Sequence, residues 1–416
     1  MKRRSLLAGA AALTAAGSGF GLLWAPAASG APSGGSHDAY FARLNALLKR
    51  DGPGRPVMLL DLARMDRNID LISKSVGRDK TYRVVVKSLP SVPLLEHVTR
   101  RAGTDALMVF HQPFLNAVAE SFPASDVLLG KPMPVAAART FYRKLRSTKF
   151  VPEHQVQWLI DSHDRLLQYQ ALAHELGVRI RVSFEIDVGL HRGGFAKPEA
   201  LRAALTVVQA DPDHLSLAGL MGYEAQLTGL GANLNHPAVA KVLGIYRGFV
   251  DSVNAAGIAP EGLTLNGAGS HTLGIYERDR LMNDLAAGSG VVMPTDFDTF
   301  HLGLHQPALF IAAPILKRYP VNRFRPDPPE NMRQIYYIYG GAWKARVVSP
   351  PDVGDAPYAS TNQSPIMTSA SVDLRVDDYM FLRPTQSEFV MLQFGDILTV
   401  RDGEIDSRWP VFQQTG

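Results

Sequence analysis

The chain has 416 residues, of which 46% are hydrophobic, and this length suits two domains or one large barrel with an appendage. Its formal net charge is only +4, and no run of basic residues predicts binding to nucleic acid. Cysteine is absent, which excludes a disulfide framework, a thiolate metal site and a cysteine nucleophile, and which fits an oxidising compartment.

The N-terminal segment is typical of an exported protein. A basic start at residues 2–4 precedes an apolar stretch at 6–16, and the small residues at 25–27 suit a cleavage site. The two arginines of the basic start, followed by leucines, resemble a twin-arginine signal. Glycine and serine interrupt the apolar stretch at its end, which makes it a poor membrane span. We therefore predict a signal peptide over 1–27, a flexible tether over 28–37, and an exported, periplasmic protein with no stable membrane span after processing.

Short apolar runs alternate with longer helical patterns between residues 38 and 304. Runs that are apolar at nearly every position are typical of strands covered on both faces. The strand candidates are residues 57–60, 83–86, 106–110, 126–129, 157–160, 181–186, 216–221 and 264–265. Eight strands that alternate with helices over this length predict an α/β fold, a (β/α)8 TIM barrel over 38–304. An open, doubly wound sheet is the competing architecture, although no glycine fingerprint for a dinucleotide follows the first strand.

The sequence pattern changes after residue 304. Proline-rich stretches separate runs in which apolar and polar residues alternate as in β-strands, at 334–339, 388–393 and 396–400. Residues 401–404 have the composition of a hairpin turn. We therefore predict a C-terminal β domain over 305–416.

Lys87 ends the second strand candidate, directly after three valines. A lysine at the carboxyl end of a barrel strand points into the mouth, where the active sites of such barrels form. Desolvation in such a place lowers the pKa of an amine and makes the amine able to form a Schiff base. A lysine that only reaches solvent is the alternative, so the assignment of Lys87 depends on partners elsewhere in the chain.

Three later segments supply such partners. Arg192 lies in a glycine-rich turn after an apolar strand, and its guanidinium has the fork geometry that binds an anionic oxygen or a carboxylate. Glycine-rich turns at 266–270 and 286–290 each follow an apolar run and offer backbone N–H groups to a phosphate. Either turn alone is more often only a tight loop, but two of them late in a barrel predict a phosphate site.

Together these segments resemble pyridoxal-phosphate (PLP) enzymes with the alanine-racemase-type barrel, and within them the branch of D-threonine aldolases and D-serine dehydratase-like enzymes. The similar segments occur in the expected order at residues 56–61, 67–69, 82–87, 219–223, 266–270, 286–289 and 403–412. The resemblance implies PLP as the cofactor and an amino acid as the small-molecule substrate. It implies most directly a lyase, an aldolase or a dehydratase, that acts on D-amino acids with a β-hydroxyl.

The resemblance also implies roles for individual residues. Lys87 would hold PLP as a Schiff base and act as one acid/base, Arg192 would contact the ring hydroxyl oxygen, and Tyr223 would line the ring or the substrate. The remaining cofactor contacts would come from Asn266, Gly267, Gly269, Ser270, Gly288 and Ser289. His191 is a candidate acid/base beside Arg192. Glu185 stands where alanine racemases often carry a carbamylated lysine, and its carboxylate would orient Arg192.

The sequence departs from that branch where a metal is usually held. Gln386 and Glu388 stand where a His and a Cys or Asp are expected, and Leu227 stands where a second His is expected. One carboxylate rarely holds a transition metal alone, so no metal site is predicted and a bound divalent metal is left open. A PLP-dependent amino-acid racemase or epimerase is therefore the second hypothesis. A non-catalytic periplasmic protein that binds PLP or an amino acid is the third, and a homodimer is left open.

Overall fold

The computed structural model describes residues 37–230, 235–323, 327, 329–354, 357–358 and 360–414. The predicted signal peptide, and the predicted tether up to residue 36, lie outside these residues, so both stay predictions. Within the described part of the chain, no helix combines the length and the apolar character that crossing a bilayer requires.

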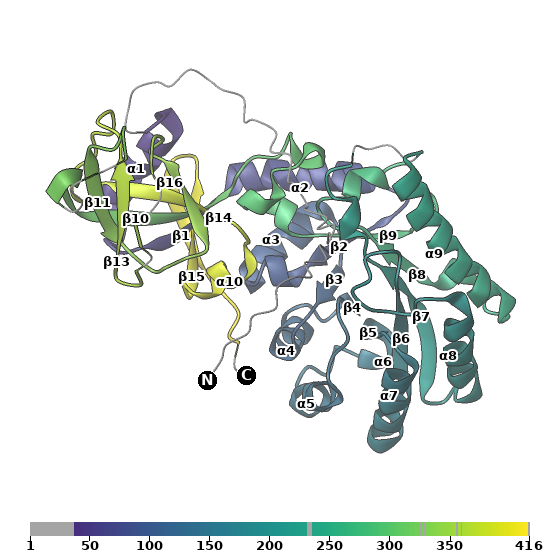
Figure 1. Cartoon of the computed structure of the whole chain (residues 1–416). Coiled ribbons are helices and arrows are strands. Elements are labelled where there is room, and N and C mark those ends of the chain that lie inside the picture. Colours follow the sequence, from purple (N-terminus) through teal and green to yellow (C-terminus); the bar gives the residue numbers. More distant parts are fainter. Residues whose placement is uncertain are drawn as a thin grey trace, which may run out of the picture. The chain divides into compact units, whose positions relative to one another are not determined.

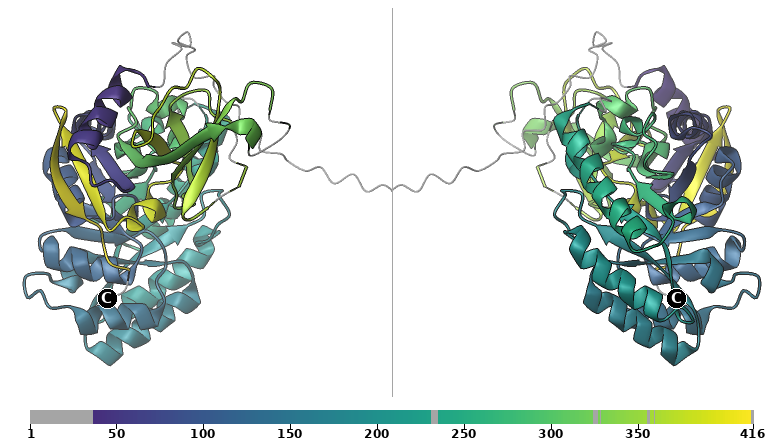
Figure 2. Two further views of the ribbon diagram at one scale, coloured as in Figure 1. Left: turned by 90° about the vertical axis from the view of Figure 1, so that its left-hand side faces the viewer. Right: turned by 90° about the vertical axis from the view of Figure 1, so that its right-hand side faces the viewer.

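Eight parallel strands close into a barrel, and helices lie around its outside (Figures 1 and 2). Neighbouring strands follow one another in chain order, and the last strand pairs with the first. The barrel strands are β2 (Thr81–Val85), β3 (Ala106–Val109), β4 (Asp126–Leu129), β5 (Val156–Ile160), β6 (Ile180–Ile186), β7 (Leu215–Gly222), β8 (Thr264–Gly267) and β9 (Asp284–Ala287). The predicted (β/α)8 TIM barrel is confirmed.

The helices around the barrel bury one apolar face. They are α2 (Leu62–Val76), α3 (Val92–Ala102), α4 (Gln112–Ser121), α5 (Val135–Lys144), α6 (Pro152–Gln155), α7 (His163–Leu176), α8 (Pro198–Ala210) and α9 (Pro237–Ala255). In α7, the Ser162 hydroxyl accepts a hydrogen bond from the Arg165 N–H at the start, and Gly177 ends the helix in the left-handed region. The buried residues of α7 recur at helical spacing: Leu166, Tyr169, Leu172 and Ala173.

The second domain is a mainly antiparallel sheet, which confirms the predicted β domain. Its longest strand, β10 (Leu309–Pro320), pairs with three other strands, β1 (Val57–Asp61), β11 (Gln334–Tyr339) and β14 (Tyr379–Pro384). The other strands are β12 (Ala345–Ser349), β13 (Gln363–Thr368), β15 (Asp396–Arg401) and β16 (Glu404–Pro410). Helix α1 (Ala39–Asp51) packs Phe41 and Leu44 into an apolar cluster with Phe310 of this sheet.

One predicted strand belongs to the sheet of the second domain rather than to the barrel, and another predicted strand contains a helix. Residues 57–60 form part of β1, which pairs with β10 and β15 of the second domain, so the segment 38–61 belongs with that sheet rather than with the barrel. Residues 284–287 supply the eighth barrel strand instead. Both runs are buried along nearly their whole length, and an apolar run alone does not specify the partner strand. Residues 388–393, predicted as a strand, contain the helix α10 (Glu388–Leu392).

A buried ionic network fills the amino-terminal part of the barrel interior. Arg83 on β2 donates to Asp284 on β9 at 2.7 Å and contacts Asp126 on β4 at 2.8 Å. Asn266 donates to Asp284 at 2.6 Å, and Gln157 donates to Asp126 at 2.9 Å. Burial alone would lower the pKa of Arg83, but the two carboxylates outweigh it and raise that pKa. The guanidinium is therefore held in its charged form.

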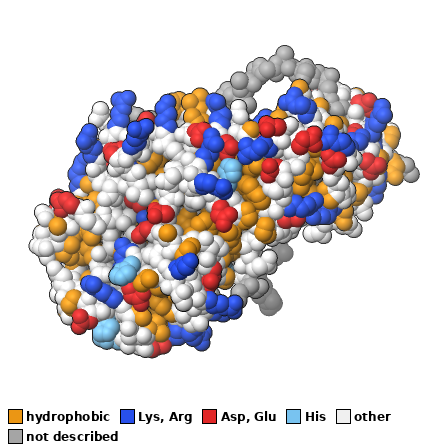
Figure 3. All heavy atoms as spheres, turned by 180° about the vertical axis from the view of Figure 1, so that it is seen from behind, with side chains coloured by type: hydrophobic (Ala, Val, Ile, Leu, Met, Phe, Trp, Pro, Cys, Tyr) orange, Lys and Arg blue, Asp and Glu red, His pale blue; other side chains and the backbone are white. Residues whose placement is uncertain are grey.

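Charged side chains of both signs are interspersed on the face of the molecule drawn in Figure 3. Blue Lys and Arg side chains lie next to red Asp and Glu side chains rather than in a continuous band. A surface that tracks phosphates along a nucleic acid needs such a band. The distribution on this face therefore agrees with the small net charge of the chain.

Candidate active site

Lys87 lies at the carboxyl end of β2, within the one-turn helix η1 (Val86–Ser88). Its Nζ forms an ion pair with Oε1 of Glu388, the first residue of α10 in the β domain, at 2.7 Å. The ring of Phe110 lies on the same Nζ, with its centroid 4.9 Å away. The Lys87 side chain is 39% exposed and that of Glu388 is 23% exposed. The amine is therefore partly shielded but accessible to a small molecule at the catalytic end of the barrel.

The turns after β8 and β9 meet beside this lysine. The backbone N–H groups of Gly288 and Gly290 both donate to the Ser270 hydroxyl, over 3.2 and 3.0 Å. The Ser289 hydroxyl donates to that of Ser88, the neighbour of Lys87, over 3.0 Å. Two amides that converge on one oxygen form the kind of donor set that binds a phosphate oxygen. The chemistry of these turns therefore fits the phosphate of PLP.

The glycines of these turns are sites where no side chain fits. A Cβ at Gly288 would lie 2.8 Å from Cβ of Val85. A Cβ at Gly269 would lie 2.8 Å from the Tyr223 ring, and one at Gly267 would meet the flexible Met282 side chain. The close packing of the turn against the strand end therefore requires glycine most strictly at Gly288. The sequence assigned all three glycines to the cofactor, and the structure places them around one end of the barrel.

Replacing Gly288 with alanine is expected to raise the Kd for PLP by about tenfold or more, because the new Cβ would displace the amides on both sides of it. Titration of the apo-protein with PLP, followed by visible absorbance, measures the change. Gly244 in α9 is a matched control, since a Cβ there meets no atom within 4 Å. Equal PLP affinities for the two variants would show that the turn after β9 is not the phosphate site.

Arg192 and Tyr223 lie together on the neighbouring strand ends. The guanidinium carbon is 5.0 Å from the centroid of the tyrosine ring. Both residues line a small cavity together with Glu185. Burial raises the pKa of Glu185, and the positive charge of Arg192 counteracts this effect. Burial, above all, also raises the pKa of Tyr223, and the negative charge of Glu388 adds to this effect. Arg192, Tyr223 and Glu185 therefore form one polar cluster at this end of the barrel.

The structure does not bring two of the predicted site residues to this cluster. The His191 side chain is 82% exposed, and its Nδ1 lies 2.8 Å from Oδ2 of Asp187 in the turn after β6. The Asn266 amide is bound to Asp284 in the barrel interior, which makes it a scaffold group. Lys87, Arg192, Tyr223 and the glycine and serine turns therefore lie at the carboxyl end of the strands, whereas the His191 side chain is exposed beside Asp187.

Glu224 is a buried carboxylic acid beneath the turn after β8, and sequence analysis did not single it out. Its Oε1 accepts a hydrogen bond from the Thr272 hydroxyl at 2.6 Å, and its Oε2 accepts one from the Ala268 N–H at 3.4 Å. Burial raises its pKa to about 7. In its neutral form, which this pKa favours below about pH 7, the carboxyl group supports the turn without repelling a phosphate bound to it.

The raised pKa of Glu224 predicts a pH-dependent stability. Between its ordinary value of 4.5 and about 7, the folded protein binds more protons than the unfolded chain, so stability falls as the pH rises through this window. Glu224→Gln is expected to raise the free energy of unfolding at pH 8 by roughly 3 kcal/mol and to change it little at pH 4. Urea unfolding at both pH values measures this difference, with the exposed Glu199→Gln as control. A difference that does not vary with pH would contradict the assignment.

The residues at the metal-type positions make other contacts. Gln386 donates to Asp296 at 2.7 Å, and Glu388 binds Lys87. Among the described residues, one group has the spacing of metal ligands: His174, Asp211 and His214. Asp211 and His214 lie in the loop that leads into the amino end of β7, so this group lies at the end of the barrel opposite to Lys87. It has no part in the candidate active site.

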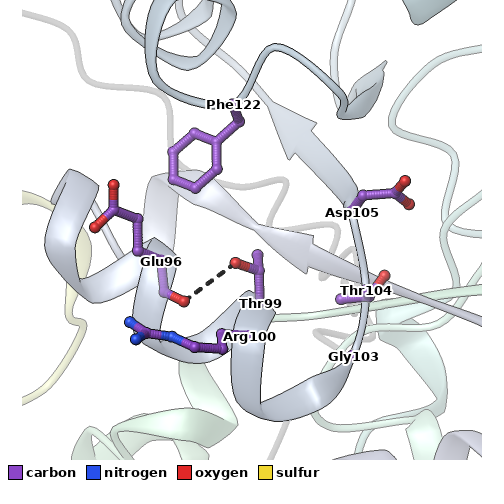
Figure 4. Close-up of a pocket in the computed structure, with 7 residues that line it drawn as sticks. All are labelled: Glu96, Thr99, Arg100, Gly103, Thr104, Asp105 and Phe122. Carbon is purple, nitrogen blue, oxygen red and sulfur yellow. Dashed lines mark hydrogen bonds between the residues drawn. The ribbon is translucent and has the colours of Figure 1, made fainter.

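A surface hollow of about 710 Å³ also lies away from Lys87 (Figure 4). Thr104 and Asp105 on its rim directly precede β3, so the hollow lies at the amino end of the strands. Its other lining residues are Glu96, Thr99, Arg100, Gly103 and Phe122. Barrel active sites form at the carboxyl end of the strands, so this hollow is not a candidate for the active site.

Comparison with known proteins decides the family. The model of the N-terminal domain of alanine racemase matches residues 60–293, more than half of the chain. This chain belongs to the alanine racemase N-terminal domain family. The resemblance predicted from the sequence is thereby confirmed, and with it PLP as the cofactor. The fit of the turns after β8 and β9 to a phosphate agrees with this assignment.

The individual relatives match most of this chain and most of their own length. The 3-hydroxy-D-aspartate aldolase of Paracoccus denitrificans (strain Pd 1222) is 22% identical over 381 residues, which are 86% of this chain and 91% of that protein. The structure of D-threonine aldolase from Filomicrobium marinum superposes with a TM-score of 0.70 and 16% identity, over 87% of this chain and 98% of that one. D-threo-3-hydroxyaspartate dehydratase from Delftia sp. HT23 gives a TM-score of 0.66 and 16% identity, over 86% and 97%. These structural likenesses show that the fold is shared.

Proposed function

We propose that this protein is a PLP-dependent lyase that acts on D-amino acids with a hydroxyl group on Cβ. The observation that carries the proposal is the contact of Lys87 with Glu388 at the carboxyl end of a barrel strand, beside two amides that converge on one point. A lysine suits the attachment of PLP, and a carboxylate beside it suits proton transfer on the substrate. The aldolase and dehydratase names of the relatives support this reaction class.

PLP, when bound, supplies an electron sink for negative charge on the substrate Cα. The chain itself supplies the groups that hold the reactants and move protons. The Lys87 amine anchors the cofactor and carries a proton to or from Cα. The amides of Gly288 and Gly290 fit the phosphate, and Arg192, stacked against Tyr223, fits an anionic oxygen.

An amino-acid racemase is the second candidate. The matching family model is that of alanine racemase, and Gln386 is bound to Asp296 in the stretch where related lyases are expected to hold a metal. A racemase needs only proton transfer at Cα, so it requires no group that acts on the β-hydroxyl. A protein that binds PLP or an amino acid without turnover is the remaining alternative.

A panel of substrates tests these alternatives. The PLP-loaded protein is incubated with D-serine, D-threonine, 3-hydroxy-D-aspartate and D-alanine, with the L-enantiomers as matched controls, and aldehyde, keto acid and enantiomer ratio are measured. We expect aldehyde or keto acid from the D-amino acids with a β-hydroxyl and none from D-alanine. Enantiomer formation without either product would establish a racemase, and binding without product would establish a binding protein. Repeating the panel after chelator treatment tests the need for a metal.

We also propose that the protein is exported to the periplasm and that it self-associates. The N-terminal sequence supports export, and mass spectrometry of the exported protein should find a mature N-terminus after Ala27. A homodimer is supported by the exposed apolar residues Phe300, Leu304 and Phe389, which are 78%, 70% and 69% exposed. Light scattering of the PLP-loaded protein measures its mass, and a monomer at all concentrations would contradict the dimer.

A further inference from the structure

Glu388 is the carboxylate that pairs with the cofactor lysine, although it comes from the other domain. Its Oε1 forms an ion pair with the Lys87 Nζ at 2.7 Å, and its side chain is 23% exposed. Glu388 is therefore a carboxylate in direct contact with the amine that is assigned to the cofactor, and it is partly shielded from water.

The start of α10 is held against the barrel, which fixes the position of Glu388. Gln386 donates to Asp296, which lies in the segment after β9, over 2.7 Å. On the preceding strand, Arg383 binds Asp298 of the same segment over 2.6 Å and also donates to the Met293 carbonyl over 2.6 Å. The Arg383 side chain is buried, whereas the side chain of its partner Asp298 is exposed. A carboxylate held in this way is preorganised for proton transfer.

We propose that Glu388 is the base that accepts the proton of the substrate's β-hydroxyl, and that the reaction is an aldol cleavage. This inference rests on the proposed function. In its ion pair with Lys87, the Glu388 carboxylate can accept a proton. Cleavage of the bond between Cα and Cβ begins with removal of the hydroxyl proton, so a base at this position suits that reaction.

The proton movements of this cleavage balance within the pair. Glu388 takes the hydroxyl proton, the electron pair of that O–H bond forms the carbonyl of an aldehyde, and the bond between Cα and Cβ breaks with its electrons left on Cα. Lys87 then donates a proton to Cα, which gives the shorter amino acid. Glu388 has gained one proton and Lys87 has lost one, and direct transfer across their 2.7 Å contact restores both groups.

The variant Glu388→Gln tests this role, because it keeps the size of the side chain and removes the base. Three quantities are measured on the PLP-loaded protein: the visible absorbance, the cleavage of D-threonine to aldehyde and glycine, and the exchange of glycine Cα protons in D₂O by NMR. Glycine is the product of D-threonine cleavage and has no β-hydroxyl, so its exchange depends on Lys87 but not on the proposed base. Glu404→Gln, on β16 of the same domain, is the matched control.

We expect Glu388→Gln to slow D-threonine cleavage by about 10²-fold or more, as is usual when a general base is removed. Its absorbance should match that of the wild type, and its glycine exchange should change by less than about threefold, which is small beside a general-base effect. Cleavage at the wild-type rate would overturn the role of Glu388 and leave the lyase function intact. An equal loss of cleavage and exchange, or a loss of absorbance, would also overturn it, because Glu388 would then act only through Lys87. A wild-type protein that forms keto acid but no aldehyde would overturn the inference and leave the lyase function intact. One that exchanges glycine but forms neither product from any β-hydroxy D-amino acid would refute the proposed function, and the inference with it.

Discussion

Replacing Lys87 with alanine is expected to abolish the visible absorbance of the PLP-loaded protein and to lower kcat/KM by about 10³-fold or more. The variant loses both the amine that anchors the cofactor and a group that moves the Cα proton, and loss of an acid/base group alone costs about 10²–10⁴-fold. Lys87 lies beside Phe110 and Glu388, and its neighbour Ser88 contacts Ser289 in one of the phosphate-type turns. Absorbance spectra and initial rates on the best substrate of the panel measure both effects.

The exposed Lys74, near the end of α2, supplies the matched control, since its replacement by alanine removes a lysine of the same barrel away from the site. Borohydride reduction of the wild-type protein, followed by proteolysis and mass spectrometry, identifies the modified lysine directly. Attachment of PLP to a peptide that lacks Lys87 would refute the assignment. A wild-type protein that stays colourless after addition of PLP would refute the cofactor assignment for the whole chain.

The parts of the site that the sequence predicted are those with local signals. Lys87 follows a strand of consecutive valines, and the turns at 266–270 and 286–290 combine glycine with serine directly after apolar runs. In a closed parallel barrel all strand ends of one kind lie on one rim, so these local patterns are sufficient to bring the residues together. In the structure, Ser88, the neighbour of Lys87, contacts Ser289 of the turn after β9. The backbone N–H groups of that turn donate to Ser270 of the turn after β8.

The parts that the sequence did not predict depend on contacts between distant segments. Glu388 could be judged only as a poor metal ligand, because its meeting with Lys87 depends on how α10 packs against the barrel. The burial of Glu224 depends on the turn that carries Thr272, which lies 48 residues away in the chain. His191 was predicted because it lies next to Arg192 in the sequence. In the turn after β6, however, the His191 side chain contacts Asp187, whereas the Arg192 side chain contacts Tyr223. Adjacency in sequence does not fix direction in such a turn.

The buried pair of Arg83 and Asp284 is expected to give the largest effect on stability. Arg83→Met should lower the free energy of unfolding by about 3–5 kcal/mol, because it leaves the Asp284 carboxylate buried without its cation. Asn266 still donates to Asp284 in this variant, but a neutral amide does not compensate the charge. Urea unfolding at neutral pH, followed by circular dichroism, measures the change.

Removing both charges of this pair separates the effect of an unpaired carboxylate from the effect of lost packing. The double variant Arg83→Met with Asp284→Asn should be less destabilised than Arg83→Met alone, because no buried charge then lacks a partner. Arg101→Ala is the control, since its bond to Asp70 lies at the surface and such pairs contribute at most about 1 kcal/mol. If Arg83→Met costs no more than this control, the network does not hold the barrel interior together. If the double variant is the less stable, the packing of the two side chains outweighs their charge.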